Sequence, residues 1–254
     1  MNSPLVQYTN ISPNKTSPRN HRIDRITIHC FVGQCSVQSG VDAFKSRLKL
    51  ASCNYVVAKD GKIGLCVEEK DRSWCSSNAS NDHRAITIEV ASDTKAPYAV
   101  TDAALNALVA LVTDICKRNG IKKVMWIPDK DTALRTEPAQ DEAVFTLHKW
   151  FKNKECPGEY LISRHAYIAD CVNYALSGPV ASDSAPNSDF KPFIVKIIVD
   201  SLNIRKEPNA KAEIRGVLKK GEKYTIVDSS GTWGKLKSGI GWINISSKYV
   251  AKQM

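Results

Sequence analysis

Short apolar runs predict the strands of the first three quarters of the chain. Residues 25–29 and 85–90 are rich in β-branched side chains, as is typical of buried strands. Residues 54–58 and 63–67 form two further runs, separated by a turn that contains Asp60-Gly61. An Asp-Gly pair between β-rich runs predicts a hairpin.

Helical spacing of apolar residues appears between these strands. It predicts helices over 39–50, 101–118, 142–151 and 163–176. The second is the best patterned, because Thr101-Asp102 can cap its start and Asn119-Gly120 can close its end. Residues 1–22, rich in Asn, Ser and Pro, are expected to form an irregular arm. Strands interleaved with helices predict an α/β fold whose mixed central sheet is flanked by helices.

The pattern changes after residue 177. Residues 178–191 are small, polar and contain proline, which is typical of a linker. Short β segments follow, at 193–199, at 223–227 and around Trp233 and Trp242, and they predict a small all-β barrel. We therefore expect a first domain over 1–177, a linker over 178–191 and a second domain over 192–254.

Composition and charge add a partner class to this picture. The 254 residues are 43% hydrophobic, and no apolar run approaches the length of a membrane span, so no membrane partner is expected. The start of the chain has no signal-peptide pattern, which predicts synthesis in the cytoplasm. Residues 192–254 carry 12 Lys/Arg and 5 Asp/Glu, or +7 of the total +10. This excess favours a polyanionic partner, and both nucleic acid and an anionic cell wall fit it.

The eight cysteines are compatible with four disulfides, but reduced and partly buried thiols are the favoured interpretation. A chain with this much apolar material does not need disulfides to fold, and no pattern points to an oxidising compartment.

The strongest chemical signal is His148 followed, after seven residues, by Cys156. Imidazole and thiolate are ligands that select zinc, and a catalytic zinc site usually takes three protein ligands. His29, at the end of the first predicted strand, is the best candidate for the third. Structural interpretations compete with this one, and His29 fits a hydrogen-bonded core residue. Two further candidates are Glu89, on the strand predicted over 85–90, and Lys154, two residues before Cys156. Glu89 also fits an ordinary strand residue, and Lys154 also fits part of a solvated charged turn.

Three pieces of the sequence together resemble the type-2 N-acetylmuramoyl-L-alanine amidases. They are residues 26–29, residues 86–90, and His148 with Cys156-Pro157-Gly158, and the resemblance covers roughly residues 20–176. This family shares its fold with peptidoglycan-recognition proteins and includes phage endolysins and bacterial autolysins.

The resemblance implies a role for each candidate site residue. His29, His148 and Cys156 match the zinc ligands, Glu89 the carboxylate that acts on the zinc-bound water, and Lys154 the lysine beside the reacting carbonyl. The chain departs from the family at Cys53-Asn54, where related phage enzymes have a tyrosine followed by a histidine. We therefore expect Glu89 to carry more of the proton transfer.

The end of the chain resembles the bacterial SH3 domains of cell-wall enzymes. Residues 201–205, 218–221, 232–236 and 239–243 carry this similarity. Such modules often bind peptidoglycan, so the resemblance implies a cell-wall ligand for the second domain.

These observations together predict a zinc-dependent amidase that cleaves the bond between N-acetylmuramic acid and L-alanine in peptidoglycan. A phage or prophage endolysin, which reaches the wall after its release from the cytoplasm, fits best. A bacterial autolysin exported without a visible signal is the next best fit. The alternative is a non-catalytic peptidoglycan-binding protein of the same fold, although pure binders commonly lack the metal ligands. Nucleic-acid binding is not expected, because no recognised reading motif accompanies the basic tail.

Overall fold

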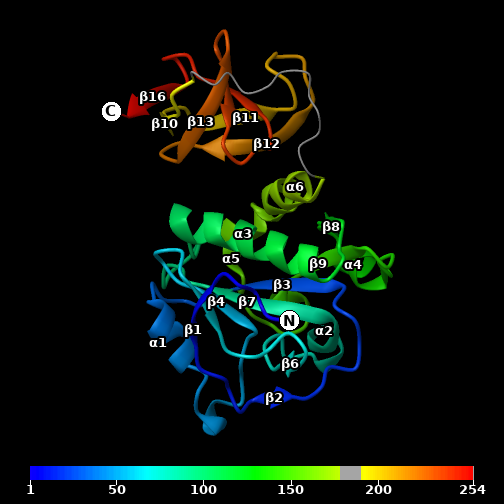
Figure 1. The fold of residues 1–254 in the computed structure, drawn as a ribbon. Helices are drawn as coiled ribbons and strands as arrows, with labels where there is room; N and C mark the ends of the chain where they lie inside the picture. Colours follow the sequence, from blue (N-terminus) through cyan, green and yellow to red (C-terminus); the bar gives the residue numbers. More distant parts are fainter. Residues whose placement is uncertain (178–189, 254) are drawn as a thin grey trace. The chain divides into compact units, whose positions relative to one another are not determined.

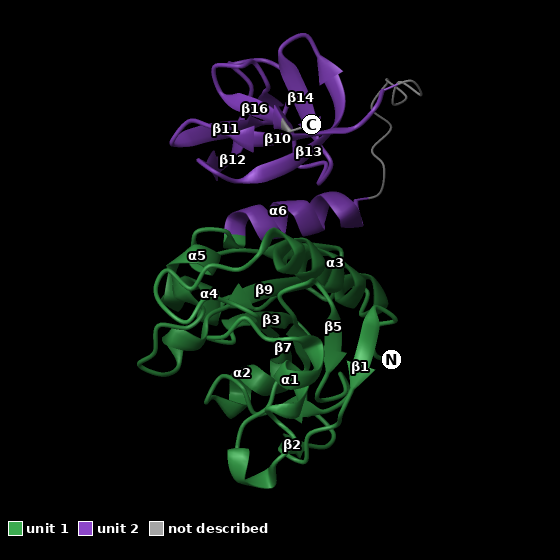
Figure 2. Ribbon diagram, turned by 90° about the vertical axis from the view of Figure 1, so that its left-hand side faces the viewer, with its two compact units in different colours: residues 1–165 green, residues 166–254 purple. Residues whose placement is uncertain are grey.

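The computed structural model describes residues 1–177 and 190–253 (Figure 1). Most of the predicted linker, residues 178–189, lies outside the described residues. The chain divides into two compact units, Met1–His165 and Ala166–Met254, coloured separately in Figure 2. No helix in the described part of the chain is long and apolar enough to cross a membrane.

The first unit is built on a mixed seven-stranded sheet. Its strands, in spatial order, are β1 (Val6–Thr9), β5 (Ile63–Leu65), β4 (Tyr55–Val57), β7 (Ala85–Val90), β3 (Arg25–Cys30), β9 (Glu142–Thr146) and β8 (Lys123–Met125). Only the β4–β5 pair, the predicted hairpin, is antiparallel. Every residue of β3 is buried, as expected for a central parallel strand covered on both faces. The predicted α/β fold with a mixed sheet is therefore confirmed.

Helices lie on both faces of this sheet (Figure 1). Helix α3 (Asp102–Arg118) lies on one face, with α1 (Val37–Asp42) and α2 (Ala79–Arg84) on the other. The sequence predicted α3 closely, because its buried leucines recur at helical spacing and the Thr101 side chain caps its start. The smaller elements of this unit are β2 (Lys15–Thr16), η1 (Arg47–Lys49), β6 (Arg72–Ser73), α4 (Lys130–Arg135), η2 (His148–Trp150) and α5 (Gly158–Ile162).

The helix predicted over 142–151 is wrong. Residues Glu142–Thr146 form strand β9, which pairs in parallel with β3 and β8, and a short 3₁₀ turn, η2, follows. Four of the five β9 residues are buried, and a run that is apolar on both faces cannot be assigned to helix or strand by periodicity alone. The error matters for the site, because His148 follows the end of a strand.

Two other predictions also need correction. The helix expected over 39–50 is divided into α1 and η1, and Leu48, an apolar residue within that range, is 90% exposed. The arm over residues 1–22 is partly regular, because β1 pairs with β5 and β2 pairs with β6.

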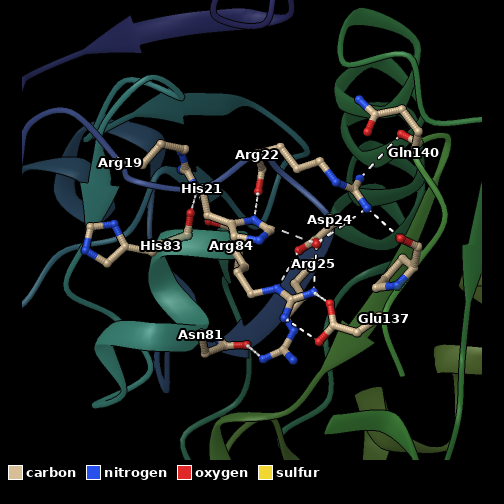
Figure 3. A network of polar contacts seen from close by, with 12 residues as sticks. Arg19, His21, Arg22, Asp24, Arg25, Asn81, His83, Arg84, Glu137 and Gln140 are labelled. Carbon is tan, nitrogen blue, oxygen red and sulfur yellow. Dashed lines mark hydrogen bonds and ion pairs between the residues drawn. The ribbon is translucent and has the colours of Figure 1, made fainter. Parts of the chain in front are cut away.

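A network of charged residues holds the beginning of β3 in place (Figure 3). The Arg84 guanidinium donates to both carboxylate oxygens of Asp24, at 2.9 and 2.7 Å, and also to Glu137. Arg22 donates to the backbone carbonyls of Pro138 and Ala139. These bonds join the start of β3 to the end of α2 and to the loop before β9, so the strands that lead to the site are fixed at their amino ends.

The second unit contains most of α6 (His165–Leu176) and a seven-stranded antiparallel sheet. The strands, in spatial order, are β12 (Ile214–Lys219), β11 (Ser201–Arg205), β15 (Trp242–Asn244), β14 (Trp233–Leu236), β13 (Lys223–Ser230), β10 (Phe193–Ile197) and β16 (Val250–Gln253). Buried aliphatic residues such as Val195, Ile204 and Ile226 form its core. The seven antiparallel strands agree with the predicted SH3-like barrel.

Candidate metal centre

The sheet brings the candidate ligands to one edge. His29 lies near the carboxyl end of β3, and His148 follows the carboxyl end of β9, the adjacent parallel strand. Cys156 reaches the same place because the backbone between His148 and Cys156 turns back, with Lys149 N donating to Cys156 O at 3.1 Å. One ligand atom from each of His29, His148 and Cys156 lies within 4.8 Å of the other two.

The three side chains are packed closely and away from solvent. His29 Nδ1 lies 3.4 Å from Cys156 Sγ, and the rings of His29 and His148 are 5.0 Å apart at 63°. His29 is fully buried and His148 is 6% exposed. The structure therefore brings together all three residues that the sequence suggested as metal ligands.

The electrostatic surroundings keep both imidazoles neutral. Burial lowers the pKa of His29 well below its usual value, and His148 and Lys154 lower it further. Burial and Lys154 lower the pKa of His148 to about 4. A neutral imidazole has a free lone pair for a cation. A side-chain contact with Cys30 and burial raise the pKa of Cys156, so a bound cation is needed to hold its thiolate. Two neutral imidazoles and a thiol are a donor set that fits zinc.

A polar loop that the sequence did not single out contacts both histidines. Ser76 Oγ lies 3.5 Å from His29 Nε2, and Ser77 Oγ lies 3.4 Å from His148 Nε2. The buried side chain of Asn81 donates to Ser76 Oγ, at 3.2 Å, and to Thr27 Oγ1, at 3.0 Å. Contacts of this kind orient metal-binding imidazoles. In the sequence this stretch has only the composition of a loop.

Glu89 lies beside His29, because the two residues are paired in the register of β7 and β3. Its Oε1 accepts a hydrogen bond from Cys75 Sγ at 3.8 Å, while its buried Oε2 has no partner. Burial, together with the nearby Cys30, raises the pKa of Glu89 to about 8. A carboxyl group that exchanges a proton near neutral pH is suited to general acid–base chemistry.

Lys154 lies at the rim of this cluster. Its side chain is exposed, yet its charge lowers the pKa of His29, His148 and Glu89, which places it within electrostatic range of all three. Every candidate site residue from the sequence is thus at or beside the same edge of the sheet.

Asn54 and Tyr55 have structural roles here. The Asn54 carboxamide accepts from the Thr87 backbone and donates to two backbone carbonyls, and Tyr55 OH donates to Glu69 at 2.5 Å. His165, the first residue of α6, is fully buried against Trp126 and Phe145.

Two family models match the sequence of this chain. The family model for N-acetylmuramoyl-L-alanine amidase matches residues 19–159, and the model for the bacterial SH3 domain matches residues 200–251. A search of curated proteins gives no match.

Several solved structures, among them two endolysins, are similar to the chain at low sequence identity. PlyL is 15% identical, covering 65% of this chain and 95% of its own, with a TM-score of 0.47. The endolysin N-acetylmuramoyl-L-alanine amidase LysCS from Clostridium intestinale URNW is 17% identical, covering 61% and 90%, with a TM-score of 0.42. A mutant endolysin from Bacillus subtilis is 16% identical, covering 64% and 96%, with a TM-score of 0.45.

The sequence match carries the assignment, because the amidase family model spans 141 of the 254 residues and includes all five candidate site residues. The chain belongs to the N-acetylmuramoyl-L-alanine amidase family and carries a bacterial SH3 domain at its carboxyl end.

Proposed function

We propose that this protein is a zinc-dependent peptidoglycan amidase, which hydrolyses the amide between N-acetylmuramic acid and L-alanine, and that its SH3 domain holds it on the cell wall. The observation that carries the proposal is the convergence of His29, His148 and Cys156 at one sheet edge, with Glu89 on the adjacent strand. Family membership supports the substrate class.

The three ligands would hold the ion, and the remaining residues would act on the substrate. Bound zinc supplies Lewis acidity, which makes water a stronger nucleophile near pH 7 and polarises the scissile carbonyl. Glu89 accepts the proton of the attacking water through its carboxylate and delivers it to the departing nitrogen of L-alanine. The products are a lactyl carboxylate and a free amine.

Lys154 stabilises the negative charge that develops on the carbonyl oxygen. Its cationic side chain lies at the exposed rim, where substrate would enter, and not in the core. Ser76 and Ser77 keep the two imidazoles oriented towards the ion.

Product analysis combined with metal analysis tests the proposal. Purified protein, with and without a chelator, is incubated with peptidoglycan and the products are identified by mass. We expect stem peptides that begin with L-alanine and one zinc per chain in the unmodified protein, and loss of the peptide products in Cys156→Ser. Cys116→Ser is the matched control, because Cys116 is buried in α3 and outside the site.

Two outcomes would contradict the proposal. Wall binding without any cleavage would instead indicate a peptidoglycan-recognition protein. Cleavage at a sugar linkage or at a peptide bond would mean that the reaction has been assigned to the wrong bond.

A further inference from the structure

A second set of possible metal ligands adjoins the first. His29, Cys75 and Glu89 each offer a ligand atom within 4.8 Å of the other two, and the described residues contain just two such groups, which share His29. Cys75 has no part in the proposed reaction, and nothing in the sequence pattern marked it.

The position of Glu89 provides an independent indication of a cation here. Its Oε2 is buried without a hydrogen-bond partner, and a buried carboxylate oxygen in that state is costly. Its other oxygen accepts a hydrogen bond from the Cys75 thiol, a weak donor at 3.8 Å. A cation would satisfy the orphaned oxygen and the sulfur together.

All three donors are held by the fold. His29 and Glu89 are register partners on β3 and β7, and Cys75 is fixed through its backbone N–H, which donates to Asp82 Oδ2 at 3.0 Å. A nitrogen, a sulfur and a carboxylate oxygen form a set that zinc, cobalt and cadmium accept.

We propose that His29, Cys75 and Glu89 form an alternative cation position, which holds a thiophilic divalent ion in place of the His29–His148–Cys156 position. The Cys75 thiol loses its proton to solvent when the ion binds. Because His29 belongs to both sets, an ion occupies one position at a time. An ion in the alternative position engages Glu89, so the chain in that state has no free carboxylate for proton transfer.

Cobalt(II) is a suitable probe, because thiolate ligation gives it a charge-transfer absorption in the near ultraviolet. In Cys156→Ser the first position loses its sulfur, so we expect this band to persist through Cys75. Adding Cys75→Ser should abolish the band and weaken cobalt binding by at least about 10- to 100-fold. Loss of a residue that only supports a metal ligand already has an effect of this size. Cys35→Ser with Cys156→Ser is the matched control, because Cys35 and Cys75 are both partly buried against the same hydrophobic cluster.

The outcomes separate this inference from the proposed function. A folded Cys156→Ser or Cys156→Ala variant without the band would overturn the alternative position and leave the amidase proposal intact. A band that survives in Cys75→Ser/Cys156→Ser would also overturn it, since a different cysteine would then be the source. Failure of the unmodified protein to bind cobalt or zinc would contradict both.

Discussion

Glu89 gains its chemical character from its surroundings in the folded protein. Burial makes its carboxyl a weaker acid, and the pairing of β7 with β3 puts it beside His29. The sequence alone could identify Glu89 as the candidate catalytic carboxylate through the family motif. It could not show the raised pKa, which depends on side chains that close over the strand.

The Glu89→Gln variant tests this role directly. The amide keeps the shape of the side chain but cannot take a proton, so we expect kcat to fall by about 10²- to 10⁴-fold while zinc content stays unchanged. Glu142→Gln, at the beginning of β9 in the same sheet, should leave kcat within about twofold. Equal activity of Glu89→Gln and the unmodified protein would exclude Glu89 as the base.

The burial of His165 predicts how the free energy of unfolding changes with pH. Burial lowers its pKa to about 4, although its hydrogen bond to Leu161 O, at 2.7 Å, opposes that shift. The unfolded chain takes up a proton near pH 6.5 and the folded chain does not, so this contribution to stability is present above pH 6.5 and is lost as the pH falls towards 4.

The His165→Phe variant should therefore lose less stability than the unmodified protein between pH 6.5 and 4. The pKa difference corresponds to about 3 kcal/mol. Urea unfolding at a series of pH values measures it, and phenylalanine suits a pocket formed by Trp126 and Phe145. Identical pH dependence in both proteins would show that the pKa of His165 is the same in the folded and the unfolded chain.

At the scale of residues, the sequence predicted the metal ligands but not the loop residues beside them. His29, His148 and Cys156 stand in a recognisable spacing, and the structure brings them together. Ser76 and Cys75 could not be found in this way, because they lie in an irregular loop. Their positions depend on their backbone N–H groups, which donate to the Asp82 carboxylate.

At the scale of elements, the capped amphipathic helix α3 was predictable and the buried strand β9 was not. Helix α3 has one apolar face and a recognisable cap, so its sequence determines its extent. Strand β9 is buried on both faces and has no alternation, so only its pairing with β3 and β8 identifies it.

The cap of α3 can be tested by substitution. Thr101 Oγ1 accepts from Ala104 N at 3.1 Å and donates to Lys59 O at 2.6 Å. Thr101→Ala removes both bonds and should lower the free energy of unfolding by about 1–2 kcal/mol, measured by chemical denaturation. Thr101→Ser keeps the hydroxyl and should cost much less. Equal losses in the two variants would mean that the methyl group, not the cap, is responsible.

At the scale of the whole molecule, charge is concentrated in the carboxyl-terminal residues. Residues 192–254 carry +7, and Lys196 on β10 lies directly opposite Lys223 on β13. Like charges in this arrangement repel unless a counter-charge is present. The sequence revealed the excess of charge, but only the strand register shows that two of the lysines are neighbours.

We therefore expect binding of the full chain to purified cell walls to weaken as salt rises from 50 to 500 mM. Lys196→Gln with Lys223→Gln should bind more weakly and with a shallower salt dependence, measured by co-sedimentation. Lys122→Gln with Lys123→Gln, in the first unit, is the matched control. Salt-independent binding would show that neutral contacts dominate.

The six consecutive register pairs between β3 and β7 also have a consequence for protein engineering. The interval between His29 and Glu89 is a property of backbone ladder geometry, so it does not depend on the length of any surface loop. Libraries that vary the segment between β7 and α3 could therefore be screened for altered wall specificity while the ligand and the base keep their spacing.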